Sequence, residues 1–511
     1  MIPQPKENAL QSLVKSLDKQ ELGVLKTYLT AFSGRKEGGT ITLKLLDLLL
    51  STKEILSDDD CSKTLYGKPK DNRFEKLKSR LKSKVLDSLI NDINIDRYND
   101  WEDIDLIAIK VRKRLTEYFI LNFSRPSEPT LRQLLDEILL TSKKYEIYSV
   151  LIEALKQKKY NDESKKGEKY FDKLNKEIDH YNECLEGTRL ANDLYYKISL
   201  KQNFSTTIEK EKFIHFLINS IEILKEKNKK ISSPYVEYYL LNIEANYYIF
   251  LEDYSKAIRK CQLLEVLIKS NVSVYRKQRI GSNLFRLNQC EIYLGNYKKS
   301  IEYAKSSQKY FPANSVNYLN SKEVEFYSLF YNCDLLNSIE VSSFLTNGIN
   351  DFAGKFRISK YSYFHANVLF VQGKFHETLK TLRENNSISE DKTGWDLGLR
   401  VLIILSYVEL DKLDLVENAL DALRKRHERS EDRDKPIRAR DKIIYRILNT
   451  LVANSYNFEN TMIDEAENIR LLKSTDKEYR WEHFSHELVK FHEWMDKKAM
   501  NGKSRLSLVA G

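Results

Sequence analysis

The chain has 511 residues, of which 41% are hydrophobic and 31% are charged. Its 84 Lys and Arg outnumber its 74 Asp and Glu, and the resulting net charge of +10 permits nucleic-acid binding without requiring it. Only 16 Gly and 8 Pro are present, which argues against turn-rich β-sandwiches, Rossmann sheets and low-complexity chains. We therefore expect an all-α protein built from long helices and short loops.

Residues 1–99 are expected to form an N-terminal basic helical domain. Apolar side chains recur at helical spacing from Phe74 through Leu77 to Leu81, which predicts one amphipathic helix. Ser57 precedes three aspartates and is typical of a helix N-cap, because its hydroxyl oxygen can accept a free backbone N–H. The domain is therefore predicted to consist of several short helices.

Positive charge is concentrated in this domain, over residues 63–84. Nine Lys or Arg and two acidic residues lie in this stretch. The pattern loosely resembles the basic helix of winged-helix or helix-turn-helix units, whose cations contact phosphates. No wing hairpin is evident after Ile90, and a solvated helix face explains the same charges. The candidate nucleic-acid contacts are Arg73, Lys76, Arg80 and Lys84.

Residues 100–230 are predicted to form an irregular helical region. Pro126 and Pro129 interrupt it, because proline does not fit a helix interior. The stretch from Tyr160 to Lys176 is polar and rich in lysine, which indicates the end of one helix and the start of the next.

Residues 231–450 contain a weak internal repeat. Five positions that follow a predicted turn are spaced by 43, 39, 39 and 38 residues: Tyr254, Tyr297, Leu336, Phe375 and Leu413. Small or turn-forming residues accompany them at Ala245, Ala257, Gly295, Ser300, Ala366 and Gly373. The pattern resembles tetratricopeptide repeats (TPR), whose helical hairpins have a usual period of about 34 residues.

The resemblance implies an α-solenoid of stacked helical hairpins with longer units than the usual repeat. One hairpin cannot bury its apolar face alone, whereas stacked neighbours can. A solenoid of this kind implies a concave face that binds a peptide, a protein partner or a second copy of the chain. The framework positions of the repeats, which are not expected contacts, are Tyr248, Tyr254, Tyr297 and Tyr407.

Residues 451–511 are predicted to form capping helices and a tail. The stripe expected to be buried on one helix consists of Trp481, Phe484, Leu488, Phe491 and Trp494. The same stretch carries a group of histidines, His483, His486 and His492. We expect these histidines on the helix face, and their spacing offers at most one edge of a metal site.

Two charged patterns near the C-terminus have competing interpretations. Arg480 and His486 fit the loose dyad spacing of HEPN-type ribonucleases, a family in which Arg and His serve RNA cleavage across a dimer. The simpler expectation is that both lie on a helix surface. The segment from Arg424 to Lys442 alternates in charge, which predicts a solvated helix end and loop, with partner docking as the alternative.

No catalytic, cofactor-binding or metal-binding motif is present. The chain lacks a phosphate-binding GxxxxGK[ST] loop, a GxSxG nucleophile elbow and the Cys spacing of zinc sites. Its five scattered cysteines predict reduced thiols, and no stretch predicts a signal peptide or a membrane span. We therefore expect no enzyme, no cofactor, no metal, no membrane partner and a cytoplasmic location.

Three functional hypotheses follow. The first is a non-catalytic scaffold or regulatory protein that binds a protein or peptide through the TPR-like array. The alternative is a nucleic-acid-binding regulator, in which the N-terminal domain reads DNA and the array senses a partner. A contiguous positive face over residues 63–84 favours the regulator, whereas acidic neighbours favour the scaffold. The third, a HEPN-like ribonuclease, requires Arg480 and His486 to face each other across a dimer.

Overall fold

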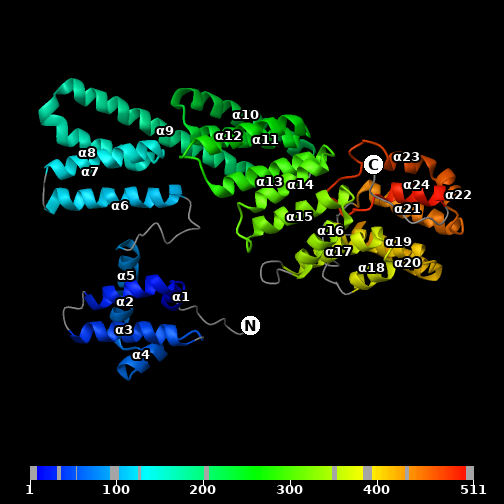
Figure 1. Ribbon diagram of the computed structural model, residues 1–511, viewed down its shortest axis with the longest axis horizontal. Helices are drawn as coiled ribbons and strands as arrows, with labels where there is room; N and C mark the ends of the chain where they lie inside the picture. Colours follow the sequence, from blue (N-terminus) through cyan, green and yellow to red (C-terminus); the bar gives the residue numbers. More distant parts are fainter. Residues whose placement is uncertain are drawn as a thin grey trace. The chain divides into compact units, whose positions relative to one another are not determined.

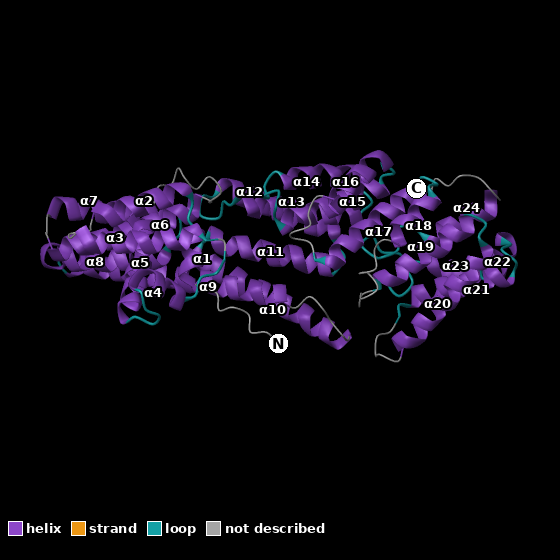
Figure 2. Ribbon diagram, turned by 90° about the horizontal axis from the view of Figure 1, so that it is seen from below, coloured by secondary structure: helices purple, strands orange, loops and turns teal. Residues whose placement is uncertain are grey.

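A computed structural model describes residues 9–31, 36–52, 54–91, 103–124, 128–200, 207–347, 354–383, 394–431 and 437–501. Every regular element in these ranges is a helix, and no strand occurs among them (Figure 2). The predicted all-α class is confirmed. The chain divides into two compact units, Met1–Arg114 and Leu115–Gly511.

The first unit is a small helical domain with its own core. Its helices are α1 (Ala9–Lys15), α2 (Lys19–Ala31), α3 (Lys36–Ser51), α4 (Asp58–Tyr66), α5 (Asn72–Asn91) and the first part of α6 (Asp103–Ser124). Helix α5 is the predicted amphipathic helix, and Leu77 and Leu81 are buried against Leu25 and Leu45 in one core. Ser57 caps α4 as expected, because its hydroxyl accepts the Asp60 N–H at 3.1 Å.

The winged-helix expectation for this unit stays a prediction. Residues 9–31, 36–52, 54–91 and 103–114 contain no strand. A wing would follow α5, and residues 92–102 lie outside the described residues.

The second unit is a succession of helices that pack mainly against their neighbours in sequence (Figure 1). They are α7 (Glu128–Lys144), α8 (Tyr148–Lys166), α9 (Glu168–Leu200), α10 (Thr207–Ile231), α11 (Pro234–Phe250), α12 (Tyr254–Ser270), α13 (Lys277–Tyr293), α14 (Tyr297–Gln308), α15 (Val316–Tyr331), α16 (Leu335–Asn347), α17 (Lys355–Val371), α18 (Phe375–Arg383), α19 (Trp395–Glu409), α20 (Leu413–Glu431), α21 (Ala439–Ala453), α22 (Phe458–Asp464), α23 (Ala466–Leu472) and α24 (Phe491–Asn501).

One turn geometry joins the two helices of each hairpin. Two residues before the second helix, the backbone φ is positive, at Glu252, Gly295, Cys333, Gly373 and Asp411. The next N–H then bonds to a carbonyl five residues earlier, as in Asp253 to Tyr248 and Lys374 to Leu369, both at 2.9 Å. This pairing satisfies the free carbonyls at the end of the first helix and reverses the chain.

The predicted turn positions are confirmed in four of the five hairpins. Tyr254, Tyr297, Phe375 and Leu413 are each the first residue of a second helix. The third position is wrong by one residue, because α16 begins at Leu335 and Leu336 is 80% exposed. We call the first residue of each second helix its anchor.

The same turn occurs outside residues 231–450. Glu146 has a positive φ two residues before Tyr148, the first residue of α8. Tyr456 also has a positive φ, and it lies two residues before Phe458, the first residue of α22. Helix pairs α7–α8 and α21–α22 therefore share the hairpin geometry of the repeats.

Small residues allow the two helices of a hairpin to approach closely. The side chains three residues after four of the anchors, at Ala257, Ser300, Ser338 and Thr378, are completely buried. Ser300 donates to the Asn288 carbonyl at 3.2 Å, and Thr378 makes the equivalent bond to Ala366 at 3.5 Å. The second unit contains an α-solenoid of TPR-like hairpins.

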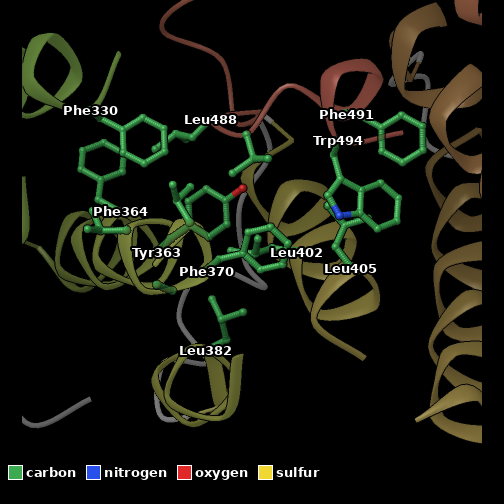
Figure 3. Packing of buried hydrophobic residues seen from close by; sticks show 14 of the residues in the cluster. Phe330, Tyr363, Phe364, Phe370, Leu382, Leu402, Leu405, Leu488, Phe491 and Trp494 are labelled. Carbon is green, nitrogen blue, oxygen red and sulfur yellow. The ribbon is translucent and has the colours of Figure 1, made fainter. Parts of the chain in front are cut away.

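Neighbouring hairpins are joined by aromatic packing. Phe326 of α15 stacks on Phe364 of α17 with ring centroids 4.5 Å apart and planes 4° apart. Figure 3 shows Phe330 and Phe364 side by side in this core. The high aromatic content of the chain is thus used largely to fill the space between stacked hairpins.

The turn geometry predicts a cost for replacing Gly295. Its φ is +75°, and nothing lies within 4 Å of an added Cβ, so any penalty comes from the backbone conformation. Gly295→Val should destabilise the protein by about 1–3 kcal/mol, because a β-branched residue is strained there. Chemical denaturation measures the loss. Gly295→Asn, which tolerates this conformation, should lose less, and equal stability of the valine variant and the wild type would contradict the assignment.

Candidate functional site

The most unusual segment of the second unit is the one between α23 and α24. Residues 473–490 form no helix, although a helix was predicted from Trp481 onward. We call this segment the strap. A connection of this length without helix or strand is uncommon in a compact unit and is usually functional. Figure 1 shows it in red, running back toward α14 and α15 before it reaches α24.

Tyrosine hydroxyls of successive hairpins bind the main chain of the strap. Tyr331 of α15 donates to the carbonyl of His483 at 2.6 Å, and Tyr363 of α17 donates to that of His486 at 2.6 Å. In Figure 3 the Tyr363 hydroxyl points toward the segment that carries Leu488. A non-helical chain can be buried only if its carbonyls find such partners. The first helices of the hairpins therefore present a surface suited to a peptide backbone.

Side chains of the strap pack against the same helices. Phe484 makes edge contacts with Tyr293 of α13 and Tyr327 of α15, at centroid distances of 5.4 and 5.0 Å. Arg480 forms a bidentate ion pair with Glu252, at 2.6 and 3.1 Å, in the turn after α11. The strap thus contacts hairpins from α11–α12 to α21–α22. We call the side of the first helices that it contacts the inner face.

Arg440 of α21 holds the strap at several points. Its guanidinium binds both carboxylate oxygens of Glu487, at 2.5 and 2.8 Å. It also donates to the carbonyls of Leu472 and Tyr479, at 2.8 and 2.6 Å. Arg440 is 2% exposed, so the ion pair is buried. Water cannot readily replace either partner, and each charge depends on the other for its stabilisation.

Arg480, His483 and His486 lie in the strap and not on a helix, so the expectation is wrong for these three, whereas His492 lies on α24 as expected. Asp441 accepts a hydrogen bond from Arg438 and contacts the His486 ring at 3.1 Å. Arg480 is bound to Glu252. Both members of the proposed ribonuclease dyad are therefore engaged inside one chain. Among the described residues, no group of three or more His, Cys, Asp or Glu could hold a metal.

The charge-dense segment is also only partly solvated. Arg424 pairs with Asp421 on an exposed face of α20, as predicted. Arg440 and Asp441 are buried and hold the strap, so the solvated interpretation is wrong for them. The roles of these two residues could not be predicted from the sequence, because alternating charge is typical of exposed helices and nothing in the local pattern marks a buried ion pair.

A small cavity of about 30 Å³ lies between the strap and the inner face. Tyr363, Asn367, Gly398, Asp441 and His486 are among its lining residues. The Asn367 Oδ1 atom is buried and has no hydrogen-bond partner among the described residues. The volume suits ordered water rather than a peptide side chain.

A second part of the inner face carries positive charge and no strap. Arg279 and Arg286 lie on α13, and the strap reaches this helix at Tyr293. The Arg279 guanidinium lies 4.3 Å from the ring centroid of Tyr238, and Arg286 donates to Asn242 Oδ1 at 3.0 Å. Among the described residues, neither arginine forms an ion pair.

The candidate nucleic-acid contacts on α5 are partly neutralised. Arg73 binds Asp71 through two nitrogens at 3.0 and 2.8 Å. The Lys84 ammonium lies 4.7 Å from the centroid of the Tyr28 ring. Lys76 and Arg80 are exposed and form no ion pair with a described residue. The structure leaves nucleic-acid binding by these four residues a prediction.

The cysteines form no disulfide among the described residues. Four of the five thiols are buried, and Cys333 is exposed. No described helix is both long and apolar enough to cross a membrane.

Comparisons with known proteins give a fold-level likeness only. No protein-family model matches the chain, and no curated protein matches it. The apo form of RapI is similar at 13% identity and a TM-score of 0.44, over 77% of this chain and 99% of that one. A STAND protein from Pyrococcus horikoshii with a tetratricopeptide repeat sensor is similar at 16% identity and a TM-score of 0.27, over 89% of this chain and 64% of that one. Similarity of this degree does not indicate what this chain binds.

The strap should loosen in acid because of His483. Burial against Tyr293, Tyr297 and Tyr331, with the nearby Lys490 charge, lowers the pKa of His483 to about 4. The released strap takes up a proton near its ordinary pKa of 6.5, whereas the seated strap does so only near 4. The contribution of His483 to the free energy of unfolding should therefore be complete above pH 6.5 and should fall as the pH drops toward 4.

The melting temperature measured from pH 7 to pH 4 tests this, with His483→Gln as the matched variant. The wild type should lose more than the variant over that interval. Arg480 lowers the pKa of Glu252 to about 2, so the contribution of Glu252 is lost only below pH 4.5. Parallel melting-temperature curves for the two proteins would show that protonation of His483 is not coupled to release of the strap.

Proposed function

We propose that this protein is a non-catalytic regulatory protein whose helical array binds a non-helical segment of a partner protein. One observation carries the proposal: the inner face already holds such a segment, the strap. Tyr331 and Tyr363 bind its carbonyls, and these contacts do not depend on which side chain the bound residue carries. A surface that binds a peptide main chain in this way is suited to a partner segment in the same conformation.

The partner would bind the part of the inner face around α11 and α13. The strap meets α13 at Tyr293 and the turn after α11 at Glu252. No described contact of the strap involves Arg279, Arg286 or Asn242. A partner can therefore bind there with the strap in place, and a second copy of the chain is one candidate source of the segment.

Selection from a displayed library of random 12-residue peptides on the full chain tests the proposal. We expect enriched peptides that bind with micromolar affinity. Tyr238→Ala should weaken them, because Tyr238 lies on α11 beside Arg279. Tyr160→Ala, on an exposed part of α8, is the control and should leave their affinity unchanged. The absence of any enriched peptide would contradict the proposal.

A second candidate function is nucleic-acid binding by α5, favoured by Lys76 and Arg80, which are exposed and form no ion pair with a described residue. These two cations contact at most about two phosphates, and each contributes about −0.9 to the log–log salt slope. In a fluorescence-anisotropy titration against duplex DNA, changing both to Gln should flatten the slope by about two units. The matched control is Lys78→Gln, because Lys78 already pairs with Asp58. Identical salt slopes for the wild type and the double variant would contradict nucleic-acid binding by Lys76 and Arg80.

A further inference from the structure

We infer that the partner segment is acidic and that Arg279 and Arg286 bind its carboxylates. The inference rests on the proposed function and specifies the chemistry of the partner. It concerns the part of the inner face on α9, α11 and α13 that the strap leaves uncovered.

The two arginines lie on the inner face because of their spacing along α13. Arg279, Arg286 and Tyr293 are seven residues apart, which places them on one side of a helix. Tyr293 contacts the strap residues His483 and Phe484. The side of α13 that carries both arginines is therefore the side that holds the strap at the end of the helix.

The repeat register shows what an arginine does at this position. Arg279 precedes its anchor Tyr297 by 18 positions, and Arg440 precedes its anchor Phe458 by the same 18. Arg440 binds the carboxylate of Glu487 in the strap through two nitrogens. Arg279 occupies the equivalent position in another hairpin and forms no ion pair with a carboxylate of the described residues.

The surroundings of the two guanidinium groups favour an anion. Both arginines are half-buried, and the groups that surround Arg286 are Cys261, Tyr195 and Tyr238 rather than acids. Arg279 rests over Tyr238 and donates to the Val274 carbonyl at 2.8 Å, which fixes its orientation. Positive charge that is partly removed from water and has no counter-ion gains most from a charged acceptor.

A carboxylate-bearing peptide is favoured over a nucleic acid by the strap itself. The strap is a peptide, and its Glu487 shows the pairing at the equivalent arginine. Arginine binds a carboxylate through two parallel hydrogen bonds, which gives direction as well as charge complementarity. The partner segment is thus a non-helical stretch with Glu or Asp spaced to meet two arginines on one side of α13.

Fluorescence anisotropy with the full chain tests the inference. The probe is a fluorescein-labelled 12-residue peptide of alternating Glu and Ser, and its matched partner alternates Gln and Ser. The Glu peptide should bind at least tenfold more tightly than the Gln peptide. The variant with Arg279→Gln and Arg286→Gln should bind the Glu peptide at least tenfold more weakly than the wild type does. Arg259→Gln, which removes one exposed charge from α12, should change the affinity less than twofold.

A second variant keeps the inference testable if the double variant fails to fold. Asn242→Asp preserves side-chain shape and places a carboxylate where Asn242 now accepts from Arg286. This internal carboxylate should compete for Arg286 and lower the affinity for the Glu peptide about tenfold.

The outcomes separate this inference from the proposed function. Equal affinity for the Glu and Gln peptides would overturn the inference that the partner is acidic. The same result would follow if Arg259→Gln lowered the affinity for the Glu peptide as much as the double arginine variant does. Tighter binding of a labelled 12-nucleotide oligothymidylate than of the Glu peptide would also overturn it. If neutral library peptides bind and the arginine variants do not affect them, the acidic inference fails and the proposed function stands. If no peptide binds, both fail.

Discussion

Replacing Arg440 by methionine should lower the free energy of unfolding by about 3–5 kcal/mol, because one partner of a buried ion pair is removed. Arg440 is 2% exposed, and the substitution would leave the Glu487 carboxylate buried without its counter-ion. The carbonyls of Leu472 and Tyr479 would lose their donor as well. Guanidinium denaturation followed by circular dichroism measures the loss.

Two further variants show whether the loss comes from the ion pair. Arg470→Met, on an exposed side of α23, should change stability by no more than about 0.5 kcal/mol. Changing Arg440 and Glu487 together to Met should cost less than Arg440→Met alone, since no unpaired charge remains. A loss below about 1 kcal/mol in the single variant would mean that Arg440 does not hold the strap.

Adding one methyl group at Gly398 should displace the strap. A Cβ there would lie 2.6 Å from the His486 carbonyl oxygen and 2.9 Å from the Tyr363 hydroxyl. These two atoms form the hydrogen bond that seats this part of the strap. Gly398→Ala should therefore destabilise the protein by about 1–3 kcal/mol through overpacking.

Limited trypsin digestion tests the Gly398 prediction beside the denaturation curve. In Gly398→Ala, cleavage after Arg480 and Lys490 should become faster, because release of the strap exposes these bonds. The control is Gly354→Ser, since nothing lies within 4 Å of an added Cβ there and serine suits a helix N-cap. If Gly398→Ala were as stable as the wild type and were digested at the same rate, the position of the strap beside Gly398 would be contradicted.

The hairpins could be predicted from sequence because their signals are local. Tyr254, Tyr297, Phe375 and Leu413 follow short turns and are spaced by one repeat, and all four begin second helices. The error at Leu336 is a shift of one residue. Cys333 adopts the positive φ of that turn, as Glu252 and Asp411 do in turns whose anchors were predicted correctly, so the absence of glycine does not explain the error.

The strap could not be predicted because its conformation depends on distant residues. Apolar side chains from Trp481 to Trp494 recur at helical spacing, yet the helix begins only at Phe491. Before that point, Tyr331 and Tyr363 supply hydrogen bonds that a helix would make within itself. The periodicity reports which side chains are buried, and it is compatible with more than one backbone path.

The candidate site shows the same division between local and distant information. Basic residues on α5 were visible as a cluster in sequence, although Arg73 pairs with Asp71. Arg279 ends a short basic run that begins at Arg276, and Arg286 stands outside it. Their significance depends on the repeat register and on the example of Arg440, both of which require the folded hairpins.

Photo-cross-linking of an acidic peptide to the full chain tests the central claim most directly. The probe is the 12-residue Glu and Ser peptide with one benzophenone side chain, and mass spectrometry locates the adducts. Binding on the inner face predicts adducts on α11 and α13, near Tyr238, Asn242 and Arg286, that an excess of unlabelled Glu peptide prevents. Adducts confined to the second helices α12 and α14, or to the first unit, would contradict it.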